Sequence, residues 1–310
     1  MEMRNASSES ENYNSYSQLF CSAKDLAGLH KELITLSVFN TTLAFIAFMG
    51  NALILFALHK ETSLHSPTKL LLRNLSVSDL LVGVISEPLV VAYWMSVVFK
   101  QWSMCRLTLG STFISTYILG PVSLLTLTSI SVDRLLALTL GLRYRQVVTL
   151  KRTWVVIISF WVLSSIAATM YLWDYHIPLW YGNIVTPLCL VTSIFSYTKI
   201  YLKLRHHRVQ VQVQGHINQG AHLNIERHKK AVSSAMWLQF TLVLCYLPAG
   251  LVGELWANSK FSSSLYLARQ CASTLVFLNS SLNPLLYCWK IKEVRQAVKD
   301  TIRQLFSSSS

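Results

Sequence analysis

Asp79 and the pair Asp133-Arg134 are ionisable groups within apolar stretches of this sequence, at about 69–99 and 104–138. A charged group is costly in such surroundings, and it usually marks a functional site. Asp79 stands near the middle of its stretch, so we take it as a candidate functional acid; a structural hydrogen bond to a neighbouring helix is the alternative. The pair stands at the end of its stretch, where an anchor at a membrane surface is the alternative.

Polar residues in two other apolar stretches are the natural partners of Asp79. Asn51 interrupts the first stretch, and Asn279 and Asn283 lie in the last one. Amide groups are costly in apolar surroundings unless they meet polar partners. We therefore expect these side chains to converge on the acid.

The composition is that of a membrane protein. Of the 310 residues, 52% are hydrophobic and only 13% are charged, and the mean hydropathy is +0.41. Soluble domains carry roughly 25% charged residues. The net charge of +13 does not indicate a nucleic-acid partner, because the basic residues are segregated between loops rather than gathered on one face.

Seven apolar segments follow one another, and each reaches or approaches the roughly 20 residues that a helix needs to cross a bilayer. They lie at about 33–58, 69–99, 104–138, 154–172, 180–204, 231–256 and 263–289. No soluble domain fits between them. The sequence therefore predicts an all-α, integral membrane bundle of seven transmembrane helices.

The predicted organisation has three parts. Residues 1–32 form a polar N-terminal tail without the apolar core of a signal peptide, and this tail carries a glycosylation sequon at Asn5. Residues 33–289 form the bundle. Residues 290–310 form a short amphipathic helix along the inner membrane surface, with a brief cytoplasmic tail.

Lysine and arginine residues predict the orientation. With the N-terminus outside, the inner loops and helix ends hold most of the 27 basic residues. The outer segments hold only Arg4, Lys24, Lys31, Lys100, Arg106, Lys260 and Arg269. This asymmetry places the tail outside the cell and Asp133-Arg134 at the inner surface.

An ordered set of short motifs runs along essentially the whole chain. The motifs are Gly50-Asn51, Leu75 to Asp79, Asp133-Arg134, Trp161, Tyr197, Cys245 to Pro248, and Asn283-Pro284 to Tyr287. This set resembles the rhodopsin-like (class A) family of G-protein-coupled receptors. The resemblance implies a plasma-membrane receptor with an extracellular ligand, heterotrimeric G proteins as partners and contact with membrane lipids. It implies no enzymatic activity.

The resemblance also implies an activation switch at the inner surface. Arg134 would meet the G protein, and Asp133 would restrain it at rest. The remaining switch residues would be Tyr197, Tyr246, Pro248, Asn283, Pro284 and Tyr287. Tyr246 stands where the family generally has tryptophan, which puts its role as a rotamer switch in question.

A sodium or water pocket is a further implication of the resemblance. Its members would be Asn51, Asp79, Ser123, Asn279 and Asn283. One carboxylate with hydroxyl and amide oxygens suits a hard cation. Allosteric Na⁺ at Asp79 is therefore expected, ordered water alone is the alternative, and no other cofactor is implied.

The outer cysteines depart from the usual family pattern. The second outer loop, at about 173–181, contains no cysteine, which leaves Cys21, Cys105 and Cys271 as candidates for one disulfide. Pairing of Cys21 with Cys271 and pairing of Cys21 with Cys105 both stay open. Melanocortin-like and lipid-receptor-like members share departures of this kind, and the subfamily stays unresolved.

Two positions lack the residues that two ligand classes of the family require. Thr116 stands where amine receptors carry an aspartate, and Phe277 stands where light-sensing receptors carry a lysine. A peptide, a lipid-like compound or another small molecule is therefore expected rather than a biogenic amine or retinal. The candidate pocket residues are Glu87, Thr116, Tyr117, Tyr246, Glu254 and Phe277.

Acids near the expected mouth, namely Glu87, Asp174 and Glu254, would suit a cationic peptide or small ligand, and a solvated rim is the simpler explanation. A membrane transporter without G-protein coupling is the alternative function, but the sequence shows no repeat between its halves.

Overall fold

The computed structural model describes residues 20–21, 27–60, 65–174, 176–214, 240–256, 258–259, 262–290 and 292–307. This part of the chain is helical and contains no strand. The predicted all-α fold is therefore confirmed. The segments 1–19 and 215–239, which include Asn5, lie outside the described residues.

The first three membrane-length helices run from residue 30 to residue 140. They are α3 (His30–Lys60), the continuous pair α4 (Ser66–Leu81) and α5 (Glu87–Val98), and α6 (Trp102–Leu140). A π-helical turn, η2 (Val82–Ser86), joins α4 to α5. Pro88 is the second residue after this turn and has no backbone N–H to donate, so the wider turn lies where the proline interrupts the helical hydrogen bonds.

The remaining helices complete the bundle. After the short helix α7 (Tyr144–Val147) come α8 (Leu150–Thr169), α9 (His176–Gln214), the helix Phe240–Trp256, α11 (Ser263–Lys290) and α12 (Lys292–Ser307). Five helices of the described chain are long and apolar enough to cross a membrane. The helix Phe240–Trp256 is shorter, and the polar residues in α11 lower its hydropathy.

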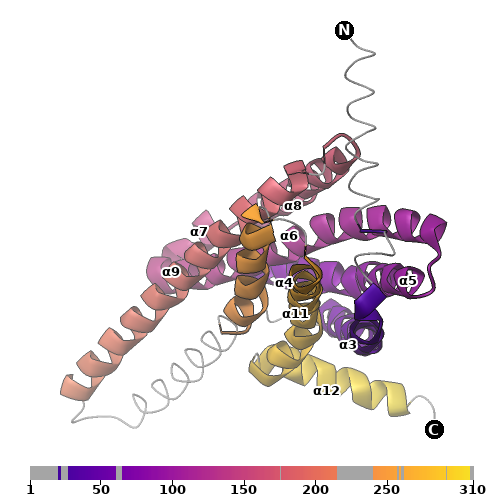
Figure 1. Ribbon diagram of the computed structural model, residues 1–310. Coiled ribbons are helices and arrows are strands. Elements are labelled where there is room, and N and C mark those ends of the chain that lie inside the picture. The colour runs from indigo at the N-terminus through magenta and orange to yellow at the C-terminus, as the bar shows by residue number, and fades with distance from the viewer. Residues whose placement is uncertain are drawn as a thin grey trace.

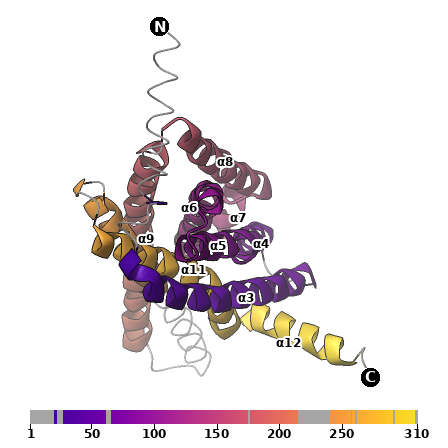
Figure 2. The same ribbon diagram turned by 45° about the vertical axis from the view of Figure 1, so that its right-hand side comes forward.

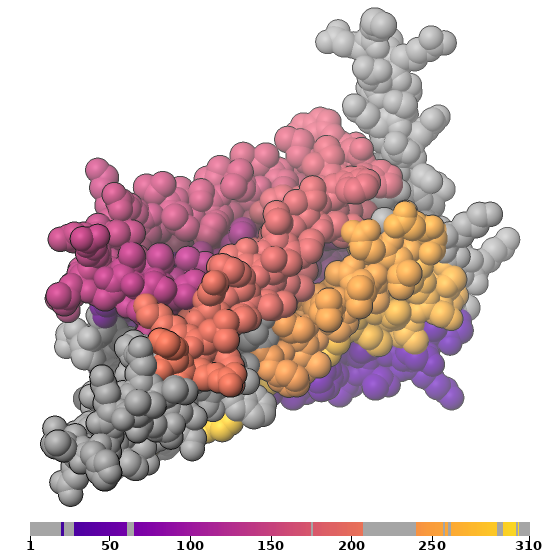
Figure 3. Space-filling model, turned by 90° about the vertical axis from the view of Figure 1, so that its left-hand side faces the viewer, coloured from indigo at the N-terminus to yellow at the C-terminus, as the bar shows by residue number. Residues whose placement is uncertain are grey.

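Helix α6 lies at the centre of the bundle and packs against α4, α5, α8 and α9 (Figure 2). Figure 3 shows α9 crossing one face of the molecule between α8 and the orange segment that contains the helix Phe240–Trp256. Large apolar side chains of α3, α8 and α9, such as Phe45, Ile158 and Phe195, are exposed at the outside of the bundle. Such a surface suits contact with lipid rather than water.

Helix α12 leaves the C-terminal end of α11 at a steep angle (Figure 1). We call the end of the bundle at α12 the inner end and the opposite end the outer end, following the orientation that the sequence predicts. Val294, Val298 and Thr301 are buried at helical spacing, whereas Arg295, Lys299 and Arg303 are exposed. The buried valines belong to the core cluster that also contains Leu58, Leu72 and Tyr287. The structure thus contains an amphipathic helix where the sequence predicts one.

Candidate functional site

Asp79 lies in the middle of the bundle with no exposed surface. Its Oδ1 accepts hydrogen bonds from Ser123 Oγ over 3.0 Å and from Ser280 Oγ over 2.8 Å, and its Oδ2 accepts one from Asn283 Nδ2 over 2.7 Å. Because these donors come from α6 and α11, the carboxylate joins three helices. Three hydrogen bonds to one carboxylate stabilise a charge that would otherwise be costly to bury.

Ser280 links the acid to Asn51, and it is a member of this network that the sequence-based set left out. Asn51 Nδ2 donates to the backbone carbonyl of Ser280 over 3.0 Å, while the Ser280 hydroxyl donates to Asp79. The Oδ1 atom of Asn51 is buried without a hydrogen-bond partner among the described residues. A buried acceptor without a partner in this network suits a bound cation or water.

Asn279 also lies in the core, and its Nδ2 is buried without a partner in the described chain. No hydrogen bond joins Asn279 to Asp79 among these residues. The structure therefore brings Ser123 and Asn283 into direct contact with Asp79. Asn51 is connected to Asp79 through Ser280. Asn279 shares α11 with Ser280 and Asn283 but does not bond to the acid in the described chain.

Asp133 faces the interior near the inner end of α6. Its carboxylate accepts hydrogen bonds from Thr68 Oγ1 over 2.9 Å and from the Tyr144 hydroxyl over 2.5 Å. Arg134 is exposed, and in the described chain it forms no ion pair with Asp133. The predicted restraint of Arg134 by Asp133 is thus not what this structure shows. Consecutive helical residues point about 100° apart, so the acid turns toward α4 and α7 while the arginine turns outward.

Two tyrosines of the predicted switch are buried, one on α9 and one on α11. Tyr197 on α9 packs with Leu135 and Leu138 of α6. Tyr287 on α11 is 1% exposed, and its hydroxyl has no hydrogen-bond partner among the described residues. Pro284 lies inside α11, one residue after Asn283.

A cavity of about 210 Å³ opens in the outer half of the bundle. Thr116, Tyr117, Tyr246 and Phe277 line it, so four of the six predicted pocket residues meet there. Residues that the sequence-based set did not include complete the wall, most notably Phe20, Phe113, Asn183, Trp256, Arg269 and Gln270. Pro248 lies on the helix Phe240–Trp256 between lining residues Tyr246 and Ala249.

The acids expected near the mouth do not line the cavity. Glu254 is exposed and does not line the cavity, and Asp174 accepts a hydrogen bond from the backbone N–H of His176 at the start of α9. Glu87 does not line the cavity either. It is fully buried after the π-helical turn, and neither carboxylate oxygen has a hydrogen-bond partner among the described residues. The extra residue of the π turn rotates the positions that follow it, so the helical period read from Asp79 misplaces Glu87.

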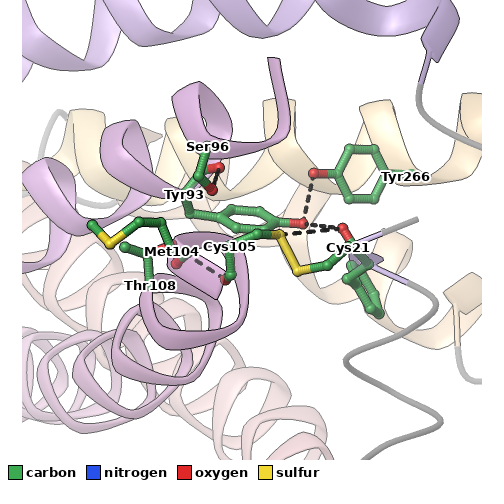
Figure 4. The surroundings of a disulfide bond; sticks show 8 residues. Cys21, Tyr93, Ser96, Met104, Cys105, Thr108 and Tyr266 are labelled. Carbon is green, nitrogen blue, oxygen red and sulfur yellow. Dashed lines mark hydrogen bonds between the residues drawn. A yellow bond between two sulfur atoms is a disulfide. The ribbon is translucent and has the colours of Figure 1, made fainter. Parts of the chain in front are cut away.

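The outer end of α6 is joined to the N-terminal segment by a disulfide between Cys21 and Cys105 (Figure 4). This is one of the two pairings that the sequence left open; Cys271 is free and exposed. The Tyr93 ring lies beside the disulfide, and its hydroxyl lies 2.9 Å from that of Tyr266 and donates to the Phe20 carbonyl over 3.3 Å. Phe20 is held in this way against the top of the bundle.

Comparison with known proteins finds membrane receptors, which agrees with the helical bundle described above. The family model "7 transmembrane receptor (rhodopsin family)" matches residues 50–177. Sheep adenosine receptor A3 is 26% identical over 81% of this chain and 84% of that receptor. Dog histamine H2 receptor is 27% identical over 87% and 80%, and mouse probable G-protein coupled receptor 45 is 24% identical over 88% and 83%.

A lipid-facing helical bundle with a buried polar network defines a multi-pass membrane protein. The chain belongs to the rhodopsin-like (class A) family of G-protein-coupled receptors, and its subfamily is not defined by these relatives.

Proposed function

We propose that this protein is a plasma-membrane receptor, with its N-terminus outside the cell, that binds a small extracellular ligand and activates heterotrimeric G proteins. The observation that carries the proposal is the order of contacts along α11. Six residues between Arg269 and Phe277 line the cavity, Ser280 and Asn283 bind Asp79, and Tyr287 lies further inward. One helix therefore touches the outer cavity, the central acid and the inner core in turn.

Ligand binding would act by shifting a population of conformations. A ligand that contacts Tyr246 and Phe277 more tightly in one arrangement of α11 and the helix Phe240–Trp256 favours that arrangement. The same change reaches the inner surface, where Arg134 is already exposed for a partner. Such coupling between two sites is reciprocal, so a bound G protein would also tighten ligand binding.

Sodium is proposed as an allosteric ion at Asp79. The carboxylate, the Ser123 and Ser280 hydroxyls and the orphaned Asn51 oxygen supply the oxygen ligands that a hard cation prefers. These residues fit the ion, which would add a positive charge beside the buried acid. Nothing in the described residues or the relatives favours the transporter alternative.

The test is a screen of G-protein dissociation in cells that express the receptor, against a panel of small ligands and several G-protein subtypes. We expect a ligand-dependent signal in wild type that Arg134→Ala abolishes at equal surface expression, because Arg134 is the exposed cation of the inner end of α6. A ligand-dependent signal that persists in the variant would refute the role given to Arg134. Substrate uptake without any G-protein response would refute the proposed function.

A further inference from the structure

Glu87 is a buried acid that the proposed function does not use. It has no exposed surface, it does not line the cavity, and neither carboxylate oxygen has a hydrogen-bond partner among the described residues. Asp79, earlier along the same run of helix, is equally buried but accepts three hydrogen bonds. An ionised carboxylate without such donors is far more costly to bury.

No basic residue near Glu87 neutralises it by direct contact in the described chain. The helices α3, α4, α6 and α11 pack against α5 or the π-helical turn. The sequence of α3 has no titratable residue between Glu32 and His59, and that of α6 has only Tyr117 between Arg106 and Asp133. Away from their inner ends, the titratable residues of α4, α5 and α11 are Asp79, Tyr93, Tyr266, Arg269 and Cys271. Arg269 is the basic residue of this set; it lies over the Trp256 ring and does not bond to the Glu87 carboxylate.

An acceptor that lacks a donor lies on α3 at the level of Glu87. A Cβ at Gly83 would lie 2.8 Å from the Ala44 carbonyl oxygen, so α3 and the π-helical turn touch there. The two consecutive helices are antiparallel, and one turn outward from this contact on each leads to Asn40 and Glu87. Asn40 Nδ2 donates over 2.8 Å to the Leu36 carbonyl and over 3.0 Å to Thr274 Oγ1. Its Oδ1 is buried without a partner among the described residues.

A proton on Glu87 would answer both observations. An ionised carboxylate can only accept hydrogen bonds, whereas a carboxylic acid also has an O–H to donate. The neutral acid avoids the cost of a buried, unpaired charge, and its O–H is the kind of donor that the Asn40 oxygen lacks.

We propose that Glu87 is a proton-binding site of this protein. It is a neutral carboxylic acid in the described arrangement, and it gives its proton to water only when α3 separates from the π-helical turn and α5. Val90, one turn further out, lines the cavity, so the outer side is the route by which water reaches the acid. A rising pH therefore favours arrangements in which this contact is open. The site is distinct from the cavity and from the sodium site at Asp79.

Infrared spectroscopy of the purified receptor in detergent detects the proton directly. A protonated carboxylic acid has a carbonyl stretching band that is well separated from the bands of a carboxylate. We expect this acid band at neutral pH in the difference spectrum of wild type minus Glu87→Gln. Glu254→Gln is the matched control, because Glu254 is exposed and does not line the cavity. The difference spectrum for Glu254 should contain carboxylate bands instead.

Thermal unfolding as a function of pH measures the same proton through stability. Unfolding exposes Glu87 to water, where a glutamate is ionised above about pH 4.3. The folded chain then holds one more proton than the unfolded chain, so this group makes wild type less stable as pH rises. The folding equilibrium of Glu87→Gln relative to wild type should rise by up to about tenfold per pH unit between about pH 5 and 8. Glu254→Gln should run parallel to wild type.

Carboxylate bands in place of the acid band for Glu87 would overturn the proposal, because they would show an ionised side chain. Parallel unfolding of wild type and Glu87→Gln over this pH range would overturn it as well. Glu87→Met replaces Glu87→Gln if the latter does not fold, since an unbranched apolar side chain of similar length also removes the acid. Neither measurement involves a ligand or a G protein, so the result is independent of the proposed function.

Discussion

The side-chain amide of Asn283 donates a hydrogen bond of 2.7 Å to the carboxylate of Asp79, and this bond fastens the polar part of α11 to α4. The bond is buried at both ends, since Asn283 is 1% exposed and Asp79 is not exposed at all. Any movement of α11 must therefore break it or carry Asp79 along.

Asp79→Asn should destabilise the receptor and remove its response to sodium. An amide replaces one acceptor oxygen by a donor, so a donor would face Asn283 or the serine hydroxyls, at a cost of about 1–3 kcal/mol. We expect wild type to melt at a higher temperature in sodium chloride than in choline chloride, and the variant to melt at the same temperature in both. Ser123→Ala is the control that removes one hydrogen bond and keeps the carboxylate. An equal sodium response in wild type and Asp79→Asn would contradict the assignment.

Tyr144→Phe should raise signalling in the absence of ligand. The Tyr144 hydroxyl holds Asp133 at the inner end of α6, and its loss removes one charge-assisted hydrogen bond, worth about 1.5–3 kcal/mol. The measurement is ligand-free G-protein dissociation at matched surface expression. Thr68→Val, which removes the other bond to Asp133, should act in the same direction, and the double variant should show coupling between the two changes. Unchanged basal signalling in both variants would show that this cluster is only structural.

Replacing either cysteine of the outer disulfide by serine should lower stability by about 2–4 kcal/mol, because the bond closes a loop between positions 84 residues apart. Cys21→Ser, Cys105→Ser and the double variant should therefore melt alike. Cys271→Ser should melt as wild type does, since that thiol is free and exposed. A large effect of Cys271→Ser would favour the other pairing.

Gly83→Ala should destabilise the bundle, and Gly120→Ala should not. A Cβ at Gly83 would lie 2.8 Å from the backbone oxygen of Ala44 and 3.0 Å from Ala47 Cβ, so α3 and the π-helical turn would have to separate, at about 1–3 kcal/mol. A Cβ at Gly120 meets nothing within 4 Å. Thermal unfolding in detergent compares the two. A fall in melting temperature for Gly120→Ala as large as for Gly83→Ala would argue against this packing.

Glu87→Gln should leave the melting temperature unchanged or raise it. Neither carboxylate oxygen of Glu87 has a hydrogen-bond partner in the described chain, so no strong contact is lost, and the neutral amide avoids the cost of burying a charge. Asp79→Asn is the contrast, because that carboxylate accepts three hydrogen bonds. A clear loss of stability in Glu87→Gln would reveal a partner that holds the Glu87 charge.

Hydropathy and motif order were sufficient to predict the helical bundle, the amphipathic α12 and the convergence of Asp79 with Asn283. These features depend on long apolar segments and on polar residues that have few places to be satisfied in a bundle. The orientation of Glu87 could not be predicted, because a π turn cannot be recognised from a pattern in a single sequence. The direction of Asp133 depends on Tyr144, which lies beyond the end of α6, where no periodicity connects the two.

The contribution of Arg269 to the cavity was missed for a different reason. A basic residue near the outer end of a membrane helix is ordinarily explained by contact with the lipid surface, so its position along α11 does not reveal which way it faces. Only the packing of its guanidinium against Trp256 shows that it turns inward.

Phe20 brings the N-terminal segment into the wall of the cavity. It is 2% exposed, lines the cavity, packs 5.4 Å from Trp256 between ring centroids, and directly precedes the cysteine that is bonded to α6. The disulfide thus keeps the Phe20 ring in the wall of the cavity. Reduction of this disulfide would remove that constraint on Phe20, so it should change the rates of ligand binding and release more than the equilibrium affinity.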